Sequence, residues 1–228
     1  MNKLNKESKV YVIQCNETLV IHYDDNINYY RDRKGVQVFT DNSGELHAIL
    51  ALTPRINKPR IETIIIDPLL VNYKLKSCCN LFSGFASLEI IVGLEYLNTS
   101  EVMNMEGMFL DCRNIRNLDL RGLDTSKVEN MEYMFYGCKY LIDLDVSKFD
   151  TSNVRYMGNM FGFCKSLKSL NLRNFDTSKV EDMHSMFYDC EKLEVINTGY
   201  KWNLSNVKKS EAMFHCCHNL HNRRWWKR

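Results

Sequence analysis

Hydrophobic positions recur along this chain with a period of 26 residues. Four blocks begin with Thr-Ser, at positions 99, 125, 151 and 177, and share the pattern T-S-x-V-x-x-M-x-x-M-F-x-x-C-x-x-L-x-x-L-x-L-x-x-F-D, with Ile, Leu or Val at the aliphatic positions. Weaker copies cover positions 78–91 and 205–220, and positions 61, 64 and 66 match the strand part alone. A fixed period of this length predicts stacked units, because no single unit can bury its own apolar face.

Each unit predicts a short strand, a turn and one or two helical turns. The L-x-x-L-x-L segment ends in alternating apolar positions, which is typical of a short parallel strand. The M-x-x-M-F-x-x-C segment has apolar spacings of three and four, which favour a helical turn with one apolar face. Asp-Thr-Ser between the two supplies turn chemistry. We therefore expect one coil of a solenoid from each unit.

The first 60 residues do not repeat and predict a β-rich cap. Val10–Ile13 and Thr18–Tyr23 alternate in hydrophobicity and indicate a β-hairpin. Val36–Phe39 and Leu46–Leu50 flank the turn signal Asp41–Gly44 and indicate a second hairpin, with a polar loop between the two. This cap would shield the first strand edge of the solenoid. The predicted parts are a hairpin cap at 1–60, a solenoid at 61–220 and a basic Trp-containing tail at 221–228.

Composition and charge exclude several classes of protein. Lys and Arg number 30 against 28 Asp and Glu, charged residues make up 25% and hydrophobic residues 45% of the chain, as in a folded soluble protein. A disordered chain, a collagen and a nucleic-acid protein driven by bulk charge are excluded. No apolar run is long enough for a membrane span, and no signal peptide is evident, so we expect a cytoplasmic protein. Phosphate-loop, G-x-S-x-G and H-E-x-x-H motifs are absent, so we expect no enzyme and no cofactor.

The unusual counts of 9 Cys and 11 Met follow from the repeat, which places both types in core columns. Stacked coils lie about 4.8 Å apart, while a disulfide needs Cβ atoms about 3.5–4.5 Å apart. We therefore expect a column of buried thiols that act as small hydrophobes. The predicted core residues are Met134, Phe135, Cys138, Leu144, Met160, Phe161, Cys164 and Leu170.

Two metal sites remain as alternatives to a chain without resident metal. His215-Cys216-Cys217-His218 has zinc-ligand chemistry, but four adjacent residues cannot all face one tetrahedral ion. An aspartate column at positions 124, 150 and 176 could hold calcium, although each carboxylate is better explained as accepting N–H groups of its own turn.

Aromatic residues at variable positions of the helical side are the candidates for partner binding. They depart from the repeat, which a structural position need not do, although they could also cover neighbouring coils. On the strand side only two arginines resemble interface hot spots. The candidates are Tyr133, Tyr136, Tyr156, Phe163 and Tyr188 on the helical side, and Arg121 and Arg173 on the strand side. Trp225 and Trp226 in the tail could close the last coil or contact an anionic surface.

The repeat resembles a known family. Asp124–Val146 follows D-T-S-x-V-x-x-M-x-x-M-F-x-x-C-x-x-L-x-x-L-D-L, and Tyr11–Asp24 is similar to the usual opening segment of BspA-like leucine-rich repeat surface proteins of bacteria and of the related mycoplasma lipoprotein repeats. The resemblance implies a curved solenoid without catalysis that binds proteins, often at a cell surface.

We thus predict an α/β repeat solenoid of the leucine-rich-repeat type, a right-handed coil of about six 26-residue units with a β-rich N-terminal cap. The predicted function is a non-catalytic protein-binding module with an unidentified protein ligand, and no nucleic acid is expected as a partner. The alternatives are an adhesin-like protein at a bacterial surface and a structural component that self-associates through its solenoid ends.

Overall fold

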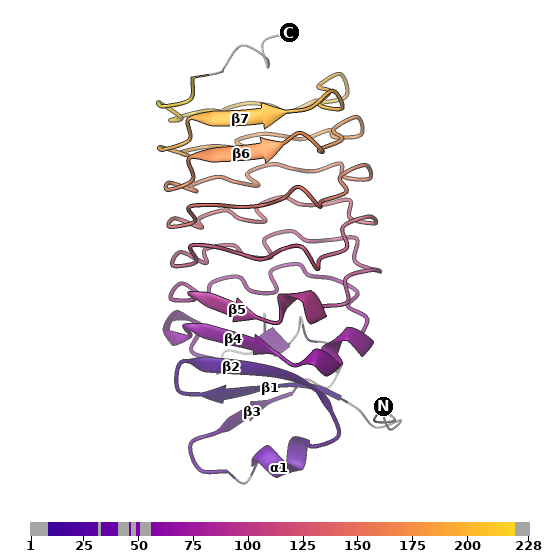
Figure 1. Ribbon diagram of the computed structural model, residues 1–228, viewed down its shortest axis with the longest axis vertical. Helices are drawn as coiled ribbons and strands as arrows, with labels where there is room; N and C mark the ends of the chain where they lie inside the picture. The colour runs from indigo at the N-terminus through magenta and orange to yellow at the C-terminus, as the bar shows by residue number, and fades with distance from the viewer. Residues whose placement is uncertain (1–8, 32, 41–45, 47–48, 51–55, 222–228) are drawn as a thin grey trace.

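The computed structural model describes residues 9–31, 33–40, 46, 49–50 and 56–221. Figure 1 shows an elongated molecule with the N-terminal sheet at one end and the last described repeat near the other. Its named elements are β1 (Lys9–Cys15), β2 (Thr18–Asp24), α1 (Ile27–Arg31), β3 (Gln37–Phe39), the 3-10 turn η1 (Lys58–Arg60), β4 (Thr63–Ile66), η2 (Pro68–Asn72), β5 (Ile90–Val92), η3 (Leu94–Tyr96), β6 (Ser169–Leu172) and β7 (Val195–Thr198).

Strands β1 and β2 form the first of the two hairpins that the sequence indicates. They pair antiparallel from Lys9 opposite Asp24 to Cys15 opposite Thr18, and Asn16 in the connection has a positive φ of 53°. Strand β2 also pairs parallel with β4, and β4 with β5, so the sheet is mixed, with the order β3-β1-β2-β4-β5. The hairpin therefore supplies backbone partners to β4, the strand before the repeats, whose edge would otherwise be open.

The second predicted hairpin is wrong. Strand β3 pairs with β1, with Val12 opposite Phe39, and this pairing buries the Phe39 side chain. Leu46, Ile49 and Leu50 are buried, while 41–45, 47 and 48 lie outside the described residues. The polar stretch predicted as a loop contains α1, because the Asp24 carboxylate accepts the Asn26 N–H at 2.8 Å and stabilises the turn before the helix.

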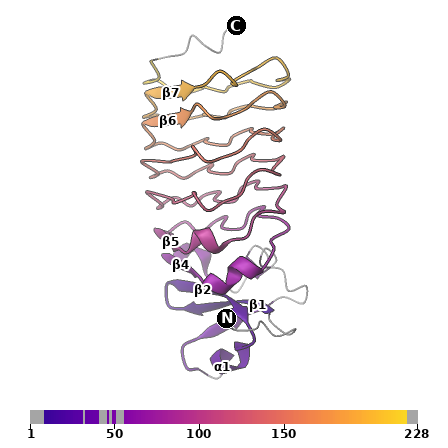
Figure 2. The ribbon, with the colours of Figure 1, turned by 45° about the vertical axis from the view of Figure 1, so that its right-hand side comes forward.

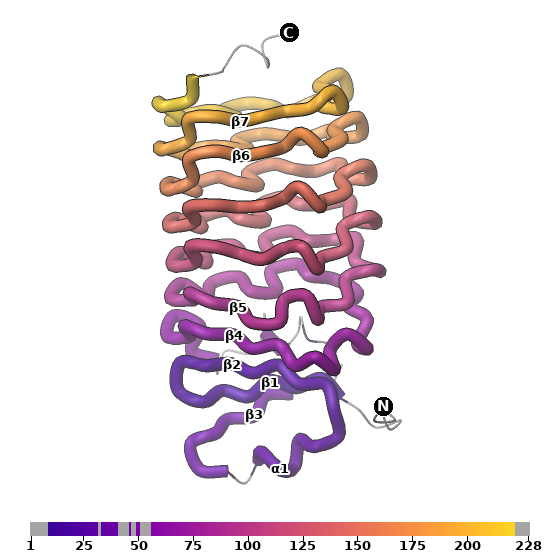
Figure 3. Tube along the Cα trace, in the orientation of Figure 1, coloured from indigo at the N-terminus to yellow at the C-terminus, as the bar shows by residue number. Residues whose placement is uncertain are grey.

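Six sequence repeats follow, which we number from residues 77, 104, 130, 156, 182 and 209. Backbone hydrogen bonds join equivalent positions of consecutive repeats: Met131 N–H donates to Tyr156 O and Phe135 N–H to Met160 O, both at 2.9 Å. Isolated parallel bridges add to them at the first residue of each repeat from 104 to 209. Figures 1, 2 and 3 show these segments lying one above another along the long axis.

The predicted α/β solenoid of the leucine-rich-repeat type is wrong. Residues 71–221 contain no α-helix, and their regular elements are three short strands, β5 to β7, and short 3-10 turns. The sheet with the most strands is the mixed N-terminal one, which has five. Most of the repeat region consists of turns and extended segments without ladder pairing, so a unit of one strand and one helix is not what the repeat encodes.

Left-handed residues are the reason that the M-x-x-M-F-x-x-C segments are not helical. Each repeat has one before its second Met and one before its Cys, for example Tyr133 at φ 57° and Gly137 at φ 75°. A right-handed helix excludes such residues. Neighbouring N–H groups then donate to the next repeat, as Gly137 does to Gly162 O at 2.8 Å, instead of to a carbonyl four residues back.

The strand prediction holds for some repeats and fails in the middle ones. Strands β6 and β7 pair parallel with Asn171 opposite Asn197, whereas the equivalent positions of the two preceding repeats are Asp119 and Asp145. Like charges at neighbouring positions of a sheet are destabilising. We attribute the missing strands at 117–121 and 143–147 to this pair of aspartates.

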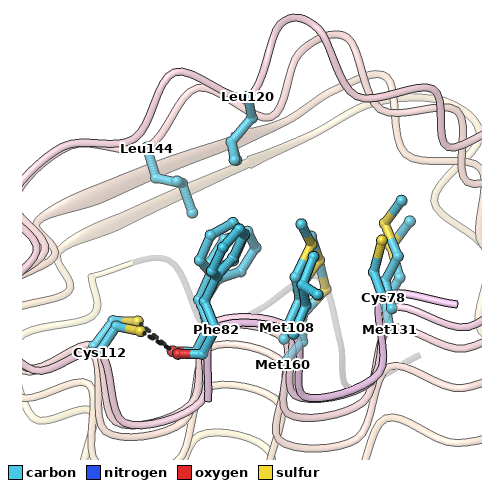
Figure 4. Close-up of a cluster of buried hydrophobic side chains, with 14 of the residues drawn as sticks. Cys78, Phe82, Met108, Cys112, Leu120, Met131, Leu144 and Met160 are labelled. Atoms are coloured by element: carbon cyan, nitrogen blue, oxygen red, sulfur yellow. Dashed lines mark hydrogen bonds between the residues drawn. The ribbon is translucent and has the colours of Figure 1, made fainter. Parts of the chain in front are cut away.

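The interior consists of columns of one residue type. Six phenylalanine rings stack with centroids 5.4–5.7 Å apart, from Phe82 through Phe109 and Phe135 to Phe214, with methionine columns beside them (Figure 4). All eight predicted core residues lie in this interior, each at most 4% exposed.

The cysteine column has a hydrogen-bonding role as well. Each thiol donates to the carbonyl oxygen of a phenylalanine one repeat earlier, as Cys112 does to Phe82 at 3.0 Å and Cys138 to Phe109 at 3.2 Å (Figure 4). All nine cysteines are free thiols. The column therefore adds a bond between repeats to carbonyl groups that also accept a backbone N–H, as the Phe109 carbonyl accepts that of Cys112 at 3.1 Å.

Candidate functional site

Four of the five aromatic candidates come together in one line of ring contacts. Tyr133 contacts Tyr136 at 5.5 Å between centroids, Tyr136 contacts Phe163 at 5.1 Å, and Phe163 contacts Tyr188 at 5.3 Å. His215, which the sequence suggested only as a metal ligand, extends the line by stacking on Tyr188 at 5.0 Å between ring centroids. The rings thus form one aromatic ladder across repeats 3 to 6, and its members are partly exposed.

Glycine and aromatic residues exchange places within this ladder. Repeat 3 has Tyr136-Gly137 where repeat 4 has Gly162-Phe163. A Cβ atom on Gly162 would lie 2.9 Å from the ring of Tyr136, so that ring occupies the space beside the glycine. Phe163 continues the ladder from the neighbouring position, at a positive φ of 59° that bulky residues seldom adopt. Its N–H donates to Tyr188 O at 2.7 Å, which helps to hold this conformation.

A groove of about 530 Å³ opens beside the ladder. It crosses repeats 1 to 4 and combines three aromatic rings with three cations. In repeat 1 the groove is lined by the small residues Ala86 and Ser87. The equivalent positions of repeat 2 hold the larger Arg113 and Asn114. The lining residues are Ala86, Ser87, Asp111, Arg113, Asn114, Tyr136, Gly137, Lys139, Tyr140, Phe163 and Lys165.

The cations of the groove differ in how their charge is compensated. Arg113 Nε lies 3.2 Å from Asp111, and Lys165 Nζ lies 2.8 Å from Asp189 and 2.6 Å from Glu191. The hydrogen bonds that Lys165 donates to these two carboxylates raise its pKa above the ordinary value. Lys139 has no acidic partner among the described residues, and its ammonium group lies 5.3 Å from the centre of the Tyr140 ring.

The surroundings of Tyr136 in the groove favour its neutral form further. Partial burial, and next to it the negative charge of Asp111, raise the pKa of Tyr136. The groove therefore presents a phenol group that can donate a hydrogen bond, beside cations that attract anions. Aromatic, Arg and Lys side chains together suit a ligand with both carboxylates and apolar surface.

The other candidates lie elsewhere. Tyr156 forms the backbone bridge between Asn130 and Asp182, and the Arg155 guanidinium lies 5.7 Å from its ring centre. Arg121 is exposed, and its Nε and Nη2 donate to Asp119 at 2.8 and 2.6 Å. Arg173 is exposed and follows directly after β6. These three do not line the groove.

Sequence reasoning missed the basic side of the groove. The residue after each column cysteine is Arg113, Lys139 and Lys165 in three consecutive repeats, and then Glu191. This column of three cations was visible in the aligned repeats. Tyr140 was visible too, as the single aromatic residue at a position that Asn114 and Ser166 hold in the adjacent repeats.

Neither metal alternative from the sequence gathers its ligands. Cys217 is buried and donates its thiol to Phe187 O at 2.9 Å, while His215 and His218 are exposed. The aspartate column caps its own turns: Asp124 and Asp150 accept the N–H two residues later at 2.9 Å, and Asp176 does so at 3.1 Å.

Two other clusters within the described residues bring possible ligand atoms within 4.8 Å of one another. They are His22, Asp24 and Asp67 in the N-terminal sheet, and Glu132, Asp182 and His184 in the repeats. In the first, Tyr11 O–H and Asn26 N–H donate to Asp24, and Leu69 N–H and His22 bond to Asp67, so both carboxylates have structural roles.

No helix among the described residues has the length and apolar character needed to cross a membrane. The basic Trp-containing tail lies outside the described residues beyond His221.

Comparison with known proteins identifies the repeat region. A family model described as "Mycoplasma protein of unknown function, DUF285" matches residues 71–142 and 104–226, which together span more than half of the chain. No curated protein and no solved structure shows significant similarity to this chain. The two matches, which overlap at residues 104–142, show that the chain belongs to this mycoplasma family of unknown function, DUF285.

Proposed function

We propose that the protein is a non-catalytic protein-binding module, and that its groove accepts a partner segment with acidic and aromatic side chains. The observation that supports this proposal most is the groove, in which Tyr136, Tyr140 and Phe163 lie beside Arg113, Lys139 and Lys165. Aromatic and arginine side chains in a hollow contribute most of the binding energy at protein interfaces.

Charge supports an acidic partner. Lys139 offers an ammonium group without a carboxylate among the described residues, and Arg113 shares its charge with Asp111 in an exposed pair. Exposed pairs of this kind contribute little to stability, so a ligand carboxylate can replace the internal one at small cost. Opposite charge also speeds association, which makes binding sensitive to salt.

A selection of displayed random peptides on the immobilised full chain tests the proposal. We expect the selected peptides to be rich in Asp, Glu and aromatic residues. Tyr140→Ser and Lys139→Glu should each weaken their binding at least about tenfold, as loss of a hot spot does. Lys148→Glu is the matched control, because Lys148 is also exposed but does not line the groove.

The result distinguishes a binding role of the aromatic ladder from a purely structural one. Peptides that bind the wild type and the Lys148 variant, but not the groove variants, support the proposal. Peptides that bind all variants equally, or that carry no excess of acidic residues, contradict it. If rings of the ladder only cover neighbouring repeats, Tyr136→Ser should lower the melting temperature without changing peptide affinity.

The finer relation to BspA-like surface proteins remains a prediction, and cellular location depends on it. A cytoplasmic protein resists protease added to intact cells, while a surface protein is cut. A self-assembling structural role is the alternative from another class. It predicts that the mass from light scattering rises with concentration, whereas a binding module keeps one mass.

A further inference from the structure

Three side chains from neighbouring repeats converge over one glycine on a part of the surface outside the groove. They are Glu132 of repeat 3 and Asp182 and His184 of repeat 5, and Gly158 of repeat 4 lies between them. A Cβ atom on Gly158 would lie 2.5 Å from His184 Nδ1 and 3.0 Å from Glu132 Oε1. The equivalent position holds Cys79 in repeat 1 and Glu106, Glu132, His184 and Glu211 in repeats 2, 3, 5 and 6, so the lack of a side chain at Gly158 makes room for the convergence.

Asp182 carries a charge that its turn does not need. At the equivalent position of repeats 2 and 3, Asn104 and Asn130 each accept the N–H two residues later at 2.8 Å. Asp182 makes the same bond to His184 N–H at 2.9 Å, although the residue is only 5% exposed. A neutral amide therefore serves the turn, and burying a carboxylate instead costs free energy unless a cation compensates it.

Negative charge is in excess around this cluster. The carboxylates of Asp182 and Glu106 act on Glu132. Those of Asp182, Glu132 and Glu211 act on Lys209, whose Nζ lies 3.0 Å from Asp182 Oδ2. The Lys209 side chain is 66% exposed and can turn outward. The Glu132 carboxylate has no hydrogen-bond or ion-pair partner among the described residues, and burial together with Asp182 and Glu106 raises its pKa.

We propose that Glu132, Asp182 and His184 bind one divalent transition-metal ion of the zinc type. One imidazole nitrogen and two carboxylate oxygens are ligands that zinc accepts, and three protein ligands leave a position for water. His184 Nδ1 already lies 2.7 Å from Asp182 Oδ1. Ligand atoms around a tetrahedral ion with bonds of about 2.0–2.1 Å lie about 3.3 Å apart, so this pair needs to separate by less than about 1 Å. The Glu132 oxygen lies within 4.8 Å of both atoms and reaches the ion by a side-chain rotation.

Asn159 completes the site as an outer partner. Its side-chain amide lies 2.7 Å from His184 Nε2, and the residue is 8% exposed. When Nδ1 binds the ion, the single proton of the neutral imidazole lies on Nε2, and the Asn159 side-chain oxygen accepts the hydrogen bond from Nε2–H once its amide is turned by half a rotation. Binding therefore moves this proton from Nδ1 to Nε2, and only an imidazole that is doubly protonated beforehand releases a proton to solvent.

Calorimetric titration of the full chain with zinc chloride tests the proposal, after alkylation of the accessible thiols, which also bind zinc. We expect one ion per chain for the wild type. Asp182→Asn, His184→Gln and Gly158→Ala should each lower the affinity at least about tenfold. His218→Gln, at an exposed histidine in the terminal Cys-His segment, is the matched control and should change nothing.

Melting temperatures keep the test independent of folding defects. Asp182→Asn preserves the turn bond that Asn104 and Asn130 make, so the metal-free variant should melt close to the wild type. Added zinc should raise the melting temperature of the wild type and of His218→Gln, but not of Asp182→Asn. The proposal would be overturned if the wild type did not bind zinc, or if zinc raised the melting temperature of Asp182→Asn as much as that of the wild type. Loss of zinc binding in His218→Gln, with binding kept in the cluster variants, would also overturn it.

Discussion

Single residues in this protein are constrained by the repeats on both sides of them. A column thiol such as Cys138 is fully buried, donates to a carbonyl of the preceding repeat and has its pKa raised by burial. Burial likewise raises the pKa of Cys78 to about 12. Because the thiolate is the nucleophile, both effects make these cysteines inert in the folded chain.

Alkylation with iodoacetamide under native conditions should therefore discriminate sharply among the nine cysteines. We expect Cys15, which is exposed, to react first, and the buried cysteines to react only after unfolding in urea. Mass spectrometry of tryptic peptides measures the extent at each site. Modification of Cys138 or Cys164 at the rate of Cys15 would show that the column opens readily.

Elements are held together mainly by hydrogen bonds between repeats, and the threonine of each Thr-Ser pair makes two of them. Thr151 Oγ1 donates to Asp176 O at 3.0 Å and accepts Asp176 N–H at 2.8 Å. Thr125 and Thr99 make the equivalent bonds one and two repeats earlier. These threonines are at most 2% exposed. The turn that recurs at each of these threonines thus depends on the next repeat.

Thr151→Val should lower the free energy of unfolding by about 1–3 kcal/mol, because valine has the same shape but leaves the Asp176 N–H and carbonyl unpaired in the interior. Urea unfolding of the variant measures this loss. Ser152→Ala, at the less buried neighbour, is the control and should change stability by less than about 0.5 kcal/mol. Equal effects of the two substitutions would contradict a special role for the threonine.

At the scale of the whole molecule, ion pairs on the surface connect consecutive repeats. Glu181 accepts from Arg155 of the preceding repeat at 2.5 Å and from Lys208 of the following one at 2.6 Å. Hydrogen bonds from Lys208 and Arg155 lower the pKa of Glu181 to about 2, and the Ser126 and Ser178 turns lower the pKa of Asp124 and Asp176.

The protein should lose stability in acid for this reason. A carboxyl group whose pKa is lower in the folded state stabilises the fold above its unfolded pKa, and the contribution is lost as the pH falls through the folded pKa. We expect the urea midpoint to fall between about pH 5 and pH 2. Glu181→Gln should make this fall shallower, whereas a midpoint that is independent of pH would contradict the role of these carboxylates.

Particular residues show how much the sequence could predict. The period of 26 placed Met134, Phe135, Cys138 and Leu144 at positions that the structure buries. It brought Tyr136, Phe163 and Tyr188 into one set that the structure joins through ring contacts. The helical turns, the second hairpin and the leucine-rich-repeat architecture were wrong, and the cations of the groove were overlooked.

The sequence by itself determined which side chains share an environment, because a strict repeat places equivalent residues in equivalent surroundings whatever the backbone does. Only the tertiary structure decided the backbone itself. Apolar spacings of three and four suit a helix, but the N–H groups of residues such as Phe135 donate to a carbonyl in the next repeat. The groove and the Glu132, Asp182 and His184 cluster arise from the same cause, since both depend on side chains of different repeats that only stacking brings together.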